Sequence, residues 1–197
     1  MHGLINRTIE NYLCDTYGRK FWCDVAGRLD AGFIDFEPMF QYDDALTPAV
    51  IDLAVQASQK PREALLEDLG TYLVTDPRAE RVRRLLRFGG VDYVDFLHSL
   101  DDLHGRARLA VPDLNLPELE MTGLGDGSYS VACTSDLDGF GHVLVGLLRA
   151  LADDYGALAV LDHQGRDGGR EMISVQLLEK QFAQGRSFEL ATKAVAK

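Results

Sequence analysis

The chain has 197 residues, 46% of them hydrophobic and 26% charged, which is typical of a globular protein that buries a sizeable core. Its formal net charge of −11 would repel a polyanion, and this excludes nucleic-acid binding as a function. The three cysteines show no zinc-ligand spacing, so we expect a reducing, cytoplasmic location. The first residues lack the pattern of a signal peptide, and the longest apolar run, from Val143, is too short to span a bilayer.

Apolar residues at helical spacing dominate the first part of the chain. They predict four helices, over residues 2–17, 19–28, 43–58 and 60–74. Gly18 is expected to separate the first two helices. Pro48 and Pro61 lie near the first turn of the later two, where a helix tolerates proline. The stretch between the second and third helices is expected to be irregular or extended.

A basic segment follows, with five arginines between Arg78 and Arg87. Such a segment is usually the solvated face of a helix. The sharper alternative is a docking site for an acidic partner or a clamp around a carboxylate. Both interpretations stay open at this point.

From Pro112 the pattern changes to short strand-like runs around polar turns. They predict two hairpins, residues 117–123 with 127–135 and residues 157–163 with 170–179. Helical periodicity returns between the hairpins, over residues 139–156. The predicted fold class is therefore α+β, with helices segregated from an antiparallel sheet. We expect one domain over residues 1–178, with a helical part (1–110), a hairpin–helix–hairpin part (115–178) and a tail (179–197).

His104 occupies an apolar position of a further helix, predicted over residues 91–108. Val94, Leu97, Leu100 and Ala107 fall on the same stripe at steps of three or four residues. By default such a residue is a core histidine bonded to a carbonyl group. A neutral imidazole in an apolar pocket is also what an axial heme ligand requires, and spacing does not separate the two interpretations.

A metal-dependent enzyme is a further alternative, with His98, Asp101, Asp102 and His104 as ligands. These side chains would face different sides of one helix, which argues against a shared site. The sequence shows no nucleophile–base pair and no phosphate-binding loop. We therefore expect that the protein is not an enzyme.

Three stretches resemble the heme–nitric oxide/oxygen-binding (H-NOX) family, the heme sensor domains related to the regulatory domain of soluble guanylate cyclase. They are MHGLINRTIENYLCDTYG, FLHSLDDLHGRARLAVPDLNLPELE and DGSYSVACTSDLDGFGHVLVGLLRALADDYG, and the resemblance covers about residues 1–178. It implies a five-coordinate ferrous heme b with His104 as the protein ligand. Pro117, thirteen residues later, matches a proline that distorts the porphyrin. Ile5 and Leu147 match apolar residues packed against the macrocycle.

The sequence departs from the family at the Tyr-x-Ser-x-Arg motif, whose side chains hold the heme propionates. Ser135 is retained, but Cys133 replaces the tyrosine and Leu137 replaces the arginine. The propionates lose a bidentate cation and a hydroxyl donor, which weakens heme binding. Three outcomes stay open: the propionates point to solvent, an arginine from elsewhere (Arg81, Arg84 or Arg106) replaces the lost one, or heme is no longer bound.

The resemblance places Leu73 and either His142 or Val143 on the distal side of the heme. Oxygen-binding members carry a distal tyrosine as hydrogen-bond donor, and tyrosine is absent at these positions. We therefore expect an apolar pocket that binds NO and CO without stable oxygen binding. His142 is expected to face solvent, although an inward orientation would let it donate to a ligand or bind iron.

Two functional hypotheses follow. The first is a heme-based NO sensor that regulates a separate signalling protein, such as a histidine kinase or a cyclic-di-nucleotide enzyme, as stand-alone bacterial members of the family do. The second is a heme-free interaction module in which His104 is structural.

Overall fold

The computed structural model describes residues 1–111 and 113–186, and of residues 79–81 and 110 it describes the backbone alone. The first part of the chain is helical, as predicted, and its first four helices are α1 (Gly3–Tyr17), α2 (Arg19–Leu29), α3 (Leu46–Ser58) and α4 (Arg62–Thr75). Gly18 separates α1 from α2 with φ of +94°, a conformation that suits glycine. Asp43 accepts the N–H of Ala45 in a local turn, and α3 begins only after this turn, later than expected.

These helices enclose an apolar cluster of their own, hereafter the N-terminal cluster. Trp22, Leu13 and Ile51 are completely buried at its centre. Leu137 and Val143, from much later in the chain, complete it. The cluster therefore joins the helical part to the start of the long C-terminal helix.

The helix predicted over residues 91–108 is broken into three pieces, which corrects the sequence-based expectation. They are α6 (Tyr93–His98), the 3-10 turn η2 (Leu100–Asp102) and α7 (Leu103–Ala110). The N–H of Ser99 bonds to the carbonyls of both Asp95 and Phe96, which tightens the backbone at the break. Asp101 accepts the N–H of Met121 at 2.7 Å, so the break also fastens η2 to the sheet.

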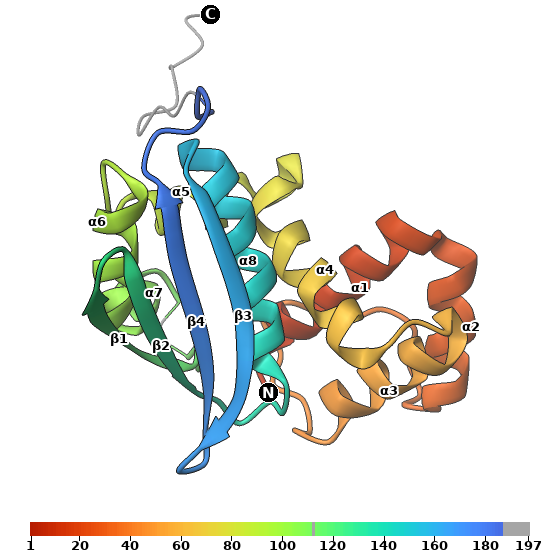
Figure 1. Cartoon of the computed structure of the whole chain (residues 1–197). Helices are drawn as coiled ribbons and strands as arrows, with labels where there is room; N and C mark the ends of the chain where they lie inside the picture. The colour runs from red at the N-terminus through yellow and green to blue at the C-terminus, as the bar shows by residue number, and fades with distance from the viewer. Residues whose placement is uncertain (112, 187–197) are drawn as a thin grey trace, which may run out of the picture.

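The sheet is antiparallel, in the order β1-β2-β4-β3. Its strands are β1 (Glu118–Gly125), β2 (Ser128–Thr134), β3 (Leu158–Asp167) and β4 (Arg170–Glu179), and α8 (Phe140–Tyr155) connects the two hairpins. Figure 1 shows α8 between the sheet and α4. The expected α+β class and the hairpin–helix–hairpin order are confirmed. Residues 187–197 of the predicted tail lie outside the described residues.

Helices α4 and α8 cross in backbone contact. A Cβ atom on Gly146 would lie 1.8 Å from the carbonyl oxygen of Glu67, and one on Gly70 would lie 1.9 Å from that of Val143. Both distances are far below van der Waals contact, so only glycine permits this crossing. Because α8 has α4 on one side and the sheet on the other, it is apolar almost all round.

The arginine-rich segment forms η1 (Pro77–Ala79) and α5 (Glu80–Arg87). Arg83 and Arg87 are mostly buried: both bind the carboxylate of Asp154 near the end of α8, at 2.7 and 2.9 Å. Arg87 also lies over the ring of Tyr155, 4.0 Å from its centroid. For these two arginines the segment acts as a carboxylate clamp inside the chain. No helix among the described residues is long and apolar enough to cross a membrane.

Candidate functional site

His104 lies on α7 and is partly buried. Its Nδ1 lies 2.8 Å from the carbonyl oxygen of Leu116. A carbonyl only accepts, so Nδ1 carries a proton, and in the tautomer of neutral imidazole that this requires, Nε2 has the lone pair. A metal-binding histidine is commonly oriented by this arrangement, and a structural core histidine also uses it. The geometry is thus compatible with either predicted role.

Pro117 follows Leu116 directly, so the His104–Leu116 contact fixes the chain where it enters β1. The residues expected against a macrocycle come from two different helices. Ile5 on α1 packs against the N-terminal cluster, whereas Leu147 on α8 belongs to the apolar cluster under the sheet and is 8% exposed. Leu73 on α4 contacts both clusters.

The three motif positions have no cationic group. Cys133 on β2 is 1% exposed, and its burial raises the pKa of the thiol to about 12. The hydroxyl oxygen of Ser135 accepts the N–H of Leu137 at 3.1 Å, which shapes the turn before α8. Leu137 is 6% exposed within the N-terminal cluster. At this position the chain therefore holds an apolar packing contact.

Of the three arginines proposed as replacements, Arg106 is engaged elsewhere. Arg106 donates to the carbonyl and hydroxyl oxygens of Ser99, at 2.9 and 3.2 Å. Arg84 lies on α5, and the side chain of Arg81 lies outside the described residues.

His142 does not face solvent, which corrects the expectation from the sequence. Its imidazole stacks on that of His163, with ring centroids 4.1 Å apart. Its side chain is 18% exposed, and Nδ1 lies 3.6 Å from a carboxylate oxygen of Glu67. Val143 is 2% exposed and packs into the N-terminal cluster. Of the two candidate distal residues, Val143 is the apolar one and His142 stacks on His163 of β3.

Sequence reasoning missed Glu171, which contacts His163 and the beginning of α8. Its carboxylate, 5% exposed, accepts the N–H groups of Gly139 and Gly141 at 3.0 Å each and lies 2.9 Å from Nε2 of His163. A side chain from β4 thus caps the first turn of α8. The available signal was strand alternation, because Glu171 shares the inward face of β4 with Ile173.

Two cavities lie elsewhere. One of 720 Å³ is lined by residues 87–91 with Asp95, His98 and Ser99, and one of 170 Å³ lies beside His142 and His163. Neither is lined by His104 or Pro117. Among the described residues, no group of three or more His, Cys, Asp or Glu side chains is arranged to hold a metal ion. The orientation of His104 is compatible with an iron ligand as well as with a structural role, whereas Cys133, Ser135 and Leu137 supply no cation that could hold a heme propionate.

Comparisons with known proteins give one consistent result. A family model described as Haem-NO-binding matches residues 2–161. The chain is 21% identical to soluble guanylate cyclase 89Da of Drosophila melanogaster over 160 residues, which are 81% of this chain and 24% of that protein. It is 28% identical to guanylate cyclase soluble subunit beta-2 of Rattus norvegicus over 131 residues, which are 63% of this chain and 19% of that protein. The chain thus spans about a quarter of these relatives or less.

Solved structures share the fold. An H-NOX protein from S. oneidensis in the Fe(II)NO ligation state superposes with a TM-score of 0.77 at 14% identity, covering 91% of this chain and 100% of that one. A mutant H-NOX protein of T. Tengcongensis superposes with a TM-score of 0.74 at 16% identity, covering 91% of this chain and 99% of that one. These matches confirm the predicted architecture.

Proposed function

Because the chain belongs to the Haem-NO-binding (H-NOX) family, we propose that it is a regulatory domain of that family which acts through contacts with a separate protein and does not hold heme tightly. Domains of this family are heme-binding sensors in signal transduction and are not catalytic. The question for this chain is how much of the sensor chemistry its own residues support.

The observation that carries the proposal is the burial of Leu137 and Cys133 at the two altered motif positions. Hydrogen bonds to a charged group contribute about 1.5–3 kcal/mol each, so each missing contact lowers heme affinity by about tenfold to a hundredfold. A propionate placed against Leu137 would also be a carboxylate beside apolar side chains, which is unfavourable. In this function His104 is structural and anchors α7 to the entry of β1 through Leu116.

A second candidate, the heme-based NO sensor, is favoured by the orientation of His104. Donation from Nδ1 to the Leu116 carbonyl leaves Nε2 free for iron. A heme bound there would supply an iron atom that takes NO or CO. The apolar residues Leu73 and Val143 would then favour these gases over oxygen. In both candidate functions the partner is a separate signalling protein, such as a histidine kinase or a cyclic-di-nucleotide enzyme. The cytoplasmic location expected from the sequence stays a prediction.

Hemin titration of three proteins separates the candidates: the native chain, His104→Ala, and the double variant Cys133→Tyr/Leu137→Arg, which restores the family motif. Absorption in the Soret region is followed after anaerobic reduction, before and after addition of NO. We expect no saturable Soret band for the native chain and a gain of binding in the restored variant. A stoichiometric Soret band in the native chain that His104→Ala abolishes, imidazole restores and NO shifts would establish the heme sensor instead.

Thermal unfolding of the same proteins provides the second measurement. If His104 is structural, His104→Ala lowers the melting temperature of heme-free protein, because the Leu116 carbonyl loses its donor. An unchanged melting temperature would argue against the structural role.

A further inference from the structure

The loop between α2 and α3 exposes two large apolar side chains at one turn. Glu37, Pro38, Met39 and Phe40 form a β-turn closed by the N–H of Phe40 on the carbonyl of Glu37, at 3.2 Å. Proline suits the second position of such a turn because its φ is already fixed there. Met39 is 80% exposed and Phe40 is 62% exposed. We call residues 37–40 the apolar turn.

The apolar turn is fastened to the beginning of α1. The N–H of Gly3 donates to the carbonyl of Phe40 at 2.7 Å, and the N–H of Tyr42 donates to the carbonyl of Met1 at 2.9 Å. A Cβ atom on Gly3 would lie 2.1 Å from the carbonyl oxygen of Glu37, so this close approach requires glycine. The turn and the first residues of α1 therefore form one unit.

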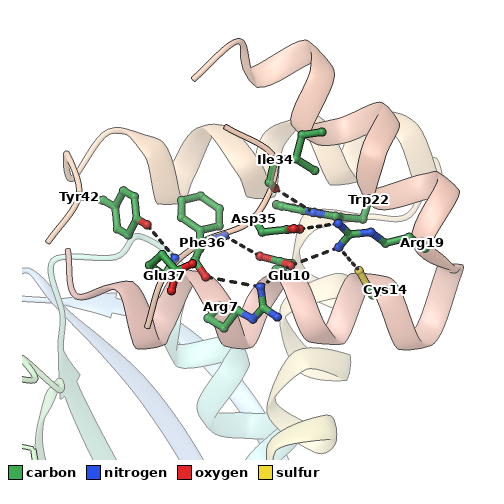
Figure 2. Close-up of polar contacts among 10 residues, drawn as sticks. All are labelled: Arg7, Glu10, Cys14, Arg19, Trp22, Ile34, Asp35, Phe36, Glu37 and Tyr42. Atoms are coloured by element: carbon green, nitrogen blue, oxygen red, sulfur yellow. Dashed lines mark hydrogen bonds and ion pairs between the residues drawn. The ribbon is translucent and has the colours of Figure 1, made fainter. Parts of the chain in front are cut away.

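Buried side chains hold the loop that leads into the turn, as Figure 2 shows. Glu10 on α1 is 1% exposed, and its carboxylate accepts the N–H of Phe36 at 2.8 Å and the guanidinium of Arg7 at 2.9 Å. On α2, the indole N–H of Trp22 donates to the carbonyl of Ile34 at 3.1 Å. These contacts fix the backbone on both sides of Asp35, so the segment that leads into the turn is held in place. We call this segment, residues 33–36, the support of the turn.

The support also has an apolar layer. The rings of Phe33, Phe36 and Tyr42 pack against one another with centroids 5.0–5.4 Å apart. The hydroxyl of Tyr42 in addition accepts the N–H of Glu37 at 2.8 Å. The loop thus has enough aromatic side chains to build its own core, yet Met39 and Phe40 stay outside it. A rigid surface of this kind binds a partner with little loss of conformational freedom.

The charge around the turn restricts the kind of partner. Residues 35–44 contain Asp35, Glu37, Asp43 and Asp44 and no lysine or arginine. Asp35 pairs with Arg19 at 2.5 Å and Asp44 pairs with the terminal ammonium group of Met1, so these two charges are compensated. Glu37 forms no ion pair among the described residues, so its charge is available. An anionic membrane or a nucleic acid would be repelled here. A protein segment with apolar side chains flanked by lysine or arginine is complementary to the turn in hydrophobicity and in charge.

We propose that the apolar turn, with the acidic side chains beside it, is a docking surface for a basic amphipathic segment of a protein partner. This rests on the proposed function that the chain acts through protein contacts, and it adds the surface and the chemistry of the partner. Because the turn is fastened to α1, which also carries Ile5, binding at this surface would act directly on the helix that faces the predicted heme side.

The test uses a fluorescein-labelled amphipathic helical peptide of leucine and lysine, with fluorescence anisotropy as the readout on the full chain. A chain of charge −11 attracts any cationic peptide, so variants decide the result. Met39→Ser/Phe40→Ser removes the apolar contact, and Glu37→Lys reverses the local charge. Their matched controls are Val160→Ser, on a side chain 55% exposed on β3, and Glu179→Lys, at the exposed end of β4.

We expect both turn variants to weaken peptide binding at least tenfold and both controls to change it less than twofold, with unchanged circular dichroism in all four. Equal weakening by turn and control variants would overturn the proposal and leave non-specific charge attraction. Binding to phosphatidylglycerol vesicles that depends on Met39 and Phe40, or light scattering that shows a dimer lost in the same variant, would overturn it in favour of a lipid or a second copy. The hemin titration above is independent, so failure of one proposal is distinguishable from failure of the other.

Discussion

The carboxylate of Asp154 fastens α5 to the end of α8, and removing it is the sharpest test of the packing described above. Its side chain is 2% exposed and binds Arg83 at 2.7 Å and Arg87 at 2.9 Å. Asp154→Ala leaves two guanidinium groups without this carboxylate, and breaking a buried pair in this way costs about 3–5 kcal/mol. Arg83 is 16% and Arg87 11% exposed, so water reaches both in part. We therefore expect a loss near the lower limit, about 3 kcal/mol.

Urea denaturation followed by circular dichroism measures this loss as a change in the free energy of unfolding. Asp153→Ala is the matched control, because Asp153 carries the same charge on the same turn and is exposed. Its expected effect is within about 0.5 kcal/mol. Limited trypsin digestion gives a second readout, since release of α5 exposes the bonds after Arg83 and Arg87. Equal stability of the two variants, with α5 still protected from trypsin, would refute the reasoning.

Two further predictions concern packing and burial. Gly146→Ala should lower the free energy of unfolding by about 1–3 kcal/mol, because its Cβ meets backbone atoms of α4. The matched change Gly27→Ala on α2, where nothing lies within 4 Å, should raise that free energy by about 0.5–1 kcal/mol, and equal effects in thermal melts would contradict the crossing. Iodoacetamide at about pH 9 should label exposed Cys23 and spare Cys133 until the chain unfolds. Burial raises the pKa of the Cys133 thiol to about 12. The neutral thiol therefore makes its full contribution to stability below about pH 8.5, the pKa of an unfolded thiol. This contribution is lost as the pH rises towards 12. Rapid labelling of Cys133 in the native protein would count against its burial.

The segment around His104 shows how far periodicity reaches. Of the predicted stripe, Leu97, Leu100 and Ala107 are buried, whereas Val94 and His104 are partly buried. The single helix over this segment was wrong, because hydrogen bonds at Ser99 and the contact from Asp101 to β1 interrupt it. An apolar stripe predicts which side of a segment is buried. It does not record whether the backbone continues without a break.

Residues 133–137, which carry the altered family motif, show the same limit of sequence-based prediction. The sequence identified Cys133 and Leu137 as departures from the family pattern, and this needed no structure. The structure added that Leu137 completes the N-terminal cluster, so the change is a packing contact as well as the loss of a cation. His142 was misplaced because its partner His163 comes from a different strand, and stacking between them leaves no periodic signal.

By itself, the sequence determined the order of most helices and strands and the α+β class, because hydrophobic periodicity is a local property of the chain. The resemblance to the family likewise rested on three stretches of the sequence and needed no structure. Only the tertiary structure decided the partners of the charged groups. Arg83 meets Asp154 across 71 residues, and Glu171 caps α8 from 32 residues beyond Gly139. The apolar turn likewise became visible only through its contacts with Gly3 and Tyr42. The physical reason is that local pattern fixes which residues avoid water, whereas the partner of a buried charge depends on which distant segments the fold brings together.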